Sequence, residues 1–163
     1  MYRVLICAVA GALFISNQAV AQAPTLKQEL VGTWTIVSWE TTLANGTKRQ
    51  VANPKGILMF DAGGRYALVT ARAGRPKFKV VSQPTTEELA AATEDFFAAS
   101  NGTWSISEAD KILTMRFDTA VVPNNEGTDL ISSVSLVGDE LKLTGVAPVA
   151  SGARVDTVYR RAR

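Results

Sequence analysis

Two side chains with ion-pairing or acid–base chemistry occupy strand positions that should face inward. Glu40 continues the alternation of Trp34 and Ile36, and Arg72 continues that of Tyr66. Because both strands should run the same way, we expect Glu40 and Arg72 at similar height. The pair could form a rim salt bridge, hold a polar ligand group, or support acid–base chemistry. The sequence leaves all three alternatives open and singles out no catalytic residue.

Two tyrosines, Tyr66 and Tyr159, should also point inward on this alternation. A buried phenol usually needs a hydrogen-bond partner, so we interpret both as structural first and as proton donors second. The loop that follows Arg72 carries Arg75, Lys77 and Lys79 around Phe78. It forms either a solvated basic rim or a surface that attracts an anionic group.

Composition excludes several kinds of chemistry. The chain has no histidine and a single cysteine, Cys7. Zinc and most transition-metal sites lose their usual ligands, and neither Ser-His-Asp nor Cys-His catalysis can be built. We predict no metal and no cofactor. With 17 basic and 15 acidic residues and no basic block, nothing favours nucleic-acid binding.

The first residues have the pattern of a secretory signal. Arg3 precedes an apolar run, and Ala19-Val20-Ala21 supplies a small-x-small cleavage site. We expect cleavage after Ala21, which leaves residues 22–163 as one domain and predicts a secreted or periplasmic protein. Arg3 leaves with the signal, which lowers the net charge from +2 by one unit. We expect no stable membrane insertion afterwards.

Short alternating segments dominate the remainder of the chain. They are separated by turn residues at regular spacing, which is typical of an antiparallel barrel or sandwich. We predict an all-β fold, an eight-stranded antiparallel up-and-down barrel with one helix inserted between its third and fourth strands. The expected strands are 33–41, 57–61, 65–72, 104–107, 111–118, 129–137, 140–146 and 154–161.

The inserted helix should cover residues 84–102. Thr85 and Glu88 fit a capping box, the composition is rich in alanine, and Phe96 and Phe97 continue an apolar stripe. The sequence also allows a short helical turn near residues 22–30. The Phe pair favours packing over a cofactor site.

Following the strand directions places the short connections 61–64, 108–110 and 138–139 at one end. The long connections then lie at the other end, which should be open. Trp34 should sit at the closed end beside Arg160 or Arg161, in a cation–π contact. Trp104, at the start of a strand running away from the opening, should lie near the open end.

Taken together, these segments resemble the bacterial lipocalin-like domain family of calycin-type barrels. The resemblance rests on "LVGTWTIVSWE", "PKGILMFDAGGRYALV", "NGTWSI", "PNNEGT" and the closing "VYRRA", and spans about residues 30–162. It implies a lipocalin-like barrel and transfers little function, because this fold hosts carriers, inhibitors and a few enzymes.

The leading hypothesis is an exported barrel that binds a small apolar or amphipathic ligand at its open end. One alternative is a cofactor-free isomerase, cyclase or lyase using Glu40, Tyr66, Arg72 or Tyr159. Another is an interaction module whose barrel is fully packed. The predicted ligand-binding residues are Glu40, Phe60, Tyr66, Leu68, Arg72, Phe78, Phe97, Met115, Phe117 and Asn124.

Overall fold

The structure, a computed structural model, describes residues 23–94, 96–146 and 152–163, without the side chains of 96 and 97. The predicted signal, residues 1–21, lies outside them. The helices are α1 (Leu26–Leu30), α2 (Thr86–Glu94) and the 3-10 turn η1 (Pro123–Asn125). The strands are β1 (Gly32–Thr42), β2 (Lys48–Gln50), β3 (Pro54–Phe60), β4 (Arg65–Arg72), β5 (Phe96–Ser107), β6 (Ile112–Ala120), β7 (Asp129–Val137), β8 (Glu140–Val146) and β9 (Arg154–Arg161).

Eight antiparallel strands close into a barrel. β1 and β3 to β9 pair in chain order, and β1 also pairs with β9, which removes the free edges of the sheet. β2 is a short addition to the upper end of β1. The predicted eight-stranded barrel is therefore confirmed, with α2 between its third and fourth strands. Within the described residues, no helix is both long and apolar enough to cross a bilayer.

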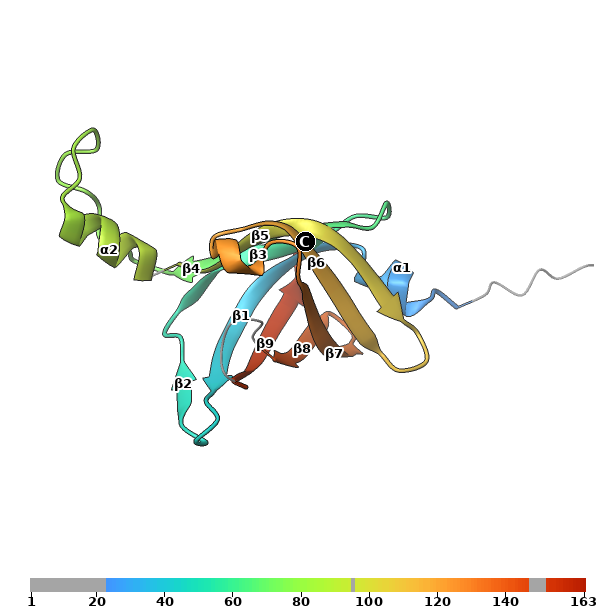
Figure 1. Cartoon of the computed structure of the whole chain (residues 1–163). Helices are drawn as coiled ribbons and strands as arrows, with labels where there is room; N and C mark the ends of the chain where they lie inside the picture. Colours follow the sequence, from blue (N-terminus) through green and yellow to red (C-terminus); the bar gives the residue numbers. More distant parts are fainter. Residues whose placement is uncertain (1–22, 95, 147–151) are drawn as a thin grey trace, which may run out of the picture.

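The two ends of the barrel differ as the loop lengths predict. The tight connections β3–β4, β5–β6 and β7–β8 lie at one end, and the long connections lie at the other. Figure 1 shows α1 and α2 at opposite ends, with α2 projecting away from the strands. None of the residues of α2 is buried. The barrel thus has a covered, closed end and an open end.

The closed end is built on Trp34, which is completely buried. Its indole Nε1 donates a 2.9 Å hydrogen bond to the carbonyl of Leu30, at the end of α1. The guanidinium of Arg161 lies 4.2 Å from the Trp34 ring centroid and donates to the carbonyls of Glu29 and Val31. The predicted cation–π contact is therefore confirmed, with Arg161 as the cation. One arginine connects the last strand, the first strand and the covering helix.

The inserted helix is shorter than the sequence predicts. The capping box is confirmed, because Thr85 and Glu88 exchange hydrogen bonds of 2.9 and 3.2 Å. However, α2 ends at Glu94, and the chain from Phe96 to Gly102 belongs to β5. Pairing with β4 and β6 on both sides supplies hydrogen bonds to this segment and outweighs its helical propensity. The prediction of helix beyond Glu94 is wrong.

The longer β5 also corrects the position of Trp104. Its indole donates to the carbonyl of Asp61 at 3.1 Å, and its ring lies 4.7 Å from that of Phe60. Asp61 begins a tight turn at the closed end, so the prediction that Trp104 lies near the opening is wrong. Because eight additional residues of β5, 96–103, precede Trp104, the strand has already reached the closed end at Trp104. Trp34 and Trp104, each of which follows a glycine by two residues, therefore both lie at the closed end of the barrel.

We predict that Arg161→Ala lowers the free energy of unfolding by about 2 kcal/mol, since it removes a cation–π contact and two hydrogen bonds from a cation. Urea denaturation measures the change. Arg160→Ala, at the exposed neighbouring position, is the matched control and should change stability by less than about 0.5 kcal/mol. Equal losses in the two variants would contradict the role assigned to Arg161.

Candidate functional site

A β-bulge in β1 decides which side chains reach the barrel interior. Ile36 pairs with Tyr159, but Ser38 pairs with Val158, so Val37 is an extra residue without a partner in β9. An extra residue inverts the alternation of everything beyond it. Trp39 therefore packs against the core, and Val37 is exposed.

Glu40 consequently lies on the outer wall, and its expected inward position is wrong. It pairs across the strands with Asp156 and forms a 2.8 Å ion pair with Lys48 of β2. The carboxylate of Asp156 accepts hydrogen bonds from Thr144 and Arg154. Partial burial raises the pKa of Asp156, but these hydrogen bonds outweigh it and hold the pKa below its usual value. The group is a surface polar network on the outside of the barrel.

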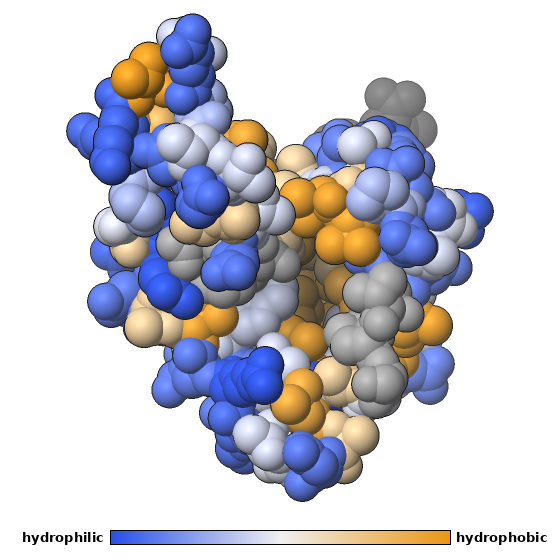
Figure 2. Space-filling model, turned by 60° about the vertical axis from the view of Figure 1, so that its left-hand side comes forward, coloured by the Kyte–Doolittle hydropathy of each residue, from blue (hydrophilic) through white to orange (hydrophobic). Residues whose placement is uncertain are grey.

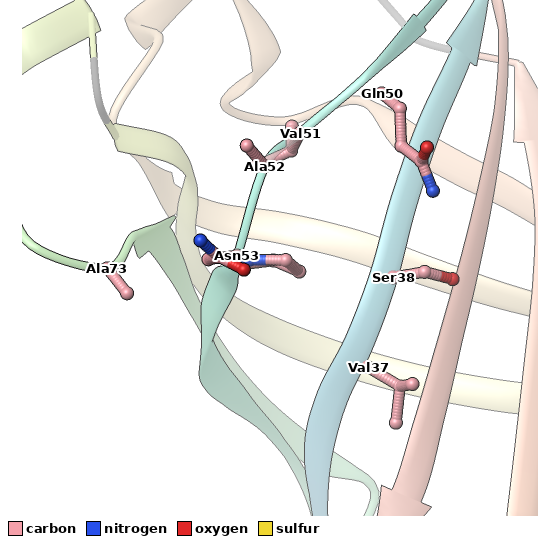
Figure 3. Close-up of a pocket in the computed structure, with 8 residues that line it drawn as sticks. Val37, Ser38, Gln50, Val51, Ala52, Asn53 and Ala73 are labelled. Atoms are coloured by element: carbon pink, nitrogen blue, oxygen red, sulfur yellow. The ribbon is translucent and has the colours of Figure 1, made fainter.

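A hollow in the barrel wall lies beside the bulge. β1 pairs with β3 only from Gly32 to Thr35, after which the two strands separate. Figure 3 shows Val37 and Ser38 on β1, with Val51, Ala52 and Asn53 across the hollow. This hollow has a volume of about 540 Å³ and lies on the outer surface. Ser38 therefore faces this hollow rather than the interior cavity.

A second space lies inside the barrel, above the packed closed end. Its volume is only about 40 Å³, close to that of one water molecule. Figure 2 shows the surface hollowed on the open side of the molecule, with apolar residues on the walls. The residues lining the inner cavity are Trp39, Leu68, Met115, Leu130, Ser132, Leu143, Gly145, Val155, Thr157 and Tyr159.

Hydroxyl groups supply the polarity of the inner wall. The buried polar residues of the described chain are Thr70, Ser132 and Thr157. Ser132 lines the cavity opposite Gly145, where a Cβ atom would come within 2.5 Å of the Ser132 hydroxyl. The absence of a side chain at Gly145 thus keeps space beside this hydroxyl.

Thr70 carries a fully buried hydroxyl on this wall. This hydroxyl has no hydrogen-bond partner in the described chain. Thr70 follows Tyr66 and Leu68 on the inner face of β4, one step above the cavity-lining Leu68. Leaving a buried hydroxyl unpaired costs roughly 1–3 kcal/mol, so such a group calls for an explanation, such as a bound water or a functional role.

The two inward tyrosines are partnered and remain protonated in the folded protein. Burial raises the pKa of Tyr159 to about 12, although a hydrogen bond with Thr157 opposes the shift. Burial also raises the pKa of Tyr66, whose hydroxyl donates to Ser100 at 3.4 Å. Phenols with raised pKa values are poor proton donors, which supports the structural interpretation of both residues.

The structure brings few of the predicted ligand-binding residues together. Leu68 and Met115 line the cavity. Phe60, Tyr66 and Phe117 are buried in the core, the first two near the closed end. The others lie elsewhere: Glu40 on the outer wall, Arg72 exposed at the end of β4, Phe78 half-buried in the following loop, Asn124 exposed in η1, and Phe97 in β5, with its side chain outside the description. Their role in binding stays a prediction.

Sequence reasoning missed the residues that give the cavity its polarity. Ser132 and Thr157 lie on the inward faces, between Leu130 and Val134 and between Val155 and Tyr159. The alternation of side chains along the strands would have predicted both as inward-facing, had polar residues on the apolar faces been counted among the candidate binding residues. Trp39 gave no such signal, because its inward position depends on the bulge.

The described residues offer no converging acid–base pair. Glu40 and Tyr159 lie on opposite faces of the barrel wall, and no group of three or more carboxylates is placed to hold a metal ion in the described chain. The arrangement can bind and orient a molecule through apolar walls and hydroxyl groups.

Comparison with known proteins identifies the family. A lipocalin-like domain family matches residues 31–159, and the chain belongs to this family. A solved structure of a lipocalin-like protein from Bacteroides uniformis ATCC 8492 is similar over 82% of this chain and 99% of that one, at 12% identity and a TM-score of 0.45. No curated protein matches the chain. The predicted resemblance is therefore confirmed.

The raised pKa of Tyr159 predicts alkaline destabilisation. Above pH 10 the phenol ionises in the unfolded chain while the folded protein keeps its proton, so stability falls as the pH rises towards about 12. The slope contributed by one such group is about 1.4 kcal/mol per pH unit. Urea unfolding at several alkaline pH values should show this fall in the wild type and a shallower one in Tyr159→Phe. Identical slopes would contradict the assignment.

The unpaired hydroxyl of Thr70 predicts that Thr70→Val stabilises the ligand-free protein. Replacing an orphan buried hydroxyl by a methyl group should raise the free energy of unfolding by about 1 kcal/mol. Thermal and urea unfolding measure the change. Thr103→Val, on the exposed face of β5, is the control and should be nearly neutral. A clear destabilisation by Thr70→Val would show that its hydroxyl has a partner.

Proposed function

We propose that this protein is an exported lipocalin-like barrel that binds a small, mostly apolar ligand at its open end. The observation that carries the proposal is the hollow on the open side together with the inner cavity beneath it. Seven of the cavity-lining residues are apolar side chains or glycine, and its hydroxyls come from Ser132, Thr157 and Tyr159. Apolar walls with few polar groups are typical of small-molecule sites.

The shape of the barrel supports binding at this end rather than at the other. Trp34 and α1 fill the closed end, while α2 projects from the opposite end and has no buried residues. Long loops on the rim of a rigid barrel are where binding residues usually reside. The N-terminal pattern of residues 1–21 supports export.

One observation favours a second candidate, an interaction module with a packed barrel. The inner cavity has a volume of only about 40 Å³, too small for the body of a ligand. In a carrier, the ligand body must occupy the hollow on the open side of the barrel (Figure 2), above this cavity, rather than the outer-wall hollow beside Val37. In an interaction module, that hollow would take up no small molecule.

Native mass spectrometry of the protein purified from its own host tests the proposal. A carrier should retain a small molecule or take one up from a lipid extract of the host. An apo mass under both conditions would overturn the carrier function and favour the interaction module.

A pair of variants localises the binding. Leu130 lines the cavity, whereas the next residue, Ile131, is 57% exposed on the outer face of β7. We expect Leu130→Trp to reduce uptake at least about tenfold by filling the space above the cavity, and Ile131→Trp to leave uptake unchanged. Uptake is measured by native mass spectrometry, with circular dichroism as the check on folding. Equal uptake by the two variants would place the ligand outside the barrel.

A further inference from the structure

We propose that the ligand is uncharged and carries one hydrogen-bonding group, such as an alcohol or ketone oxygen, which forms hydrogen bonds with the hydroxyls of Thr70 and Ser132 on the inner wall of the barrel. This inference rests on the proposed function and names the ligand class for the same site. It distinguishes such a ligand from an amphipathic anion, whose carboxylate would instead stay near the basic residues of the rim.

The charge of the inner wall supports a neutral ligand. None of the described residues that line the cavity is charged, and the buried polar residues among them and their neighbours are Thr70, Ser132 and Thr157. Tyr159 stays protonated, with a pKa of about 12. A carboxylate placed here would lose its hydration without meeting a cation, which strongly disfavours its burial.

The size of the cavity limits what can enter it. A volume of about 40 Å³ holds a hydroxyl or carbonyl oxygen but no hydrocarbon body. The lining reaches Leu130 and Val155, near the strand ends that carry the long loops. A ligand would therefore insert its polar tip first and leave its apolar body in the hollow above (Figure 2).

Two hydroxyls of the inner wall can form a hydrogen bond with the polar group of the ligand. Thr157 is already engaged, because it donates to the carbonyl of Leu143 and bonds to Tyr159. Ser132 lines the cavity beside Gly145. Thr70 is not among the residues that line the cavity, but its fully buried, unpaired hydroxyl lies one step above the cavity-lining Leu68 on the inner face of β4. A hydroxyl can donate or accept, so both an alcohol and a ketone satisfy it.

The test compares three ten-carbon probes with the full mature protein at neutral pH: decanol, decan-2-one and decanoate. Isothermal titration measures each affinity. We expect decanol and decan-2-one to bind at least about tenfold more tightly than decanoate, because only the latter must bury a charge. Thr70→Val and Ser132→Ala should each weaken decanol binding about three- to tenfold.

Matched variants on the outer wall separate this role from general effects on the strands. Thr103→Val and Ser135→Ala, both at exposed positions, should leave decanol affinity unchanged. The inference is supported if decanol affinity falls in at least one inner-wall variant and in neither control variant. Tightest binding by decanoate, lost in Arg72→Ala, would overturn it while leaving the carrier function intact. Unchanged affinity in both inner-wall variants would also overturn it, and binding of none of the probes would remove the carrier function as well.

Discussion

The closure of the sheet between β1 and β9 governs the arrangement of the upper barrel. These strands pair along almost their whole length only because Val37 is accommodated as an unpaired residue. That insertion turns Trp39 inward and Glu40 outward, just beyond Thr35, where the pairing of β1 with β3 ends. The side chains that β1 presents to the upper inner wall thus follow from one additional residue in one strand.

The closed end depends on a second connection between the chain termini. Arg161 contacts the Trp34 ring and the carbonyls of Glu29 and Val31, while Glu108 accepts hydrogen bonds from the first amides of α1 at 2.9 Å. The segment that follows the predicted cleavage site is thereby held against the barrel. Side chains fill the lower interior, and the inner cavity of the described barrel lies in the opposite half.

The sequence was sufficient to predict features that local chemistry determines. Alternation, turn residues and loop lengths gave the barrel and its two unlike ends, and the capping residues gave the start of α2. Features decided by pairing between distant strands were not predictable. The descent of β5 to Trp104, the bulge at Val37 and therefore the outward position of Glu40 depend on how neighbouring strands align. The inner-wall hydroxyl of Ser132 was within reach, because it occupies a regular inward position.

The excursion from Ala73 to residue 95 has a consequence for how this protein can change over evolutionary time. Ala71 of β4 pairs with Phe96 of β5, so this segment is structurally a long hairpin connection between two adjacent strands. Doubling the length of such a connection costs only about 0.6 kcal/mol of chain entropy. Since no residue of α2 is buried, we expect insertions and deletions there to leave the barrel's core packing intact. Relatives can therefore diverge in what surrounds the opening while inheriting an unaltered barrel.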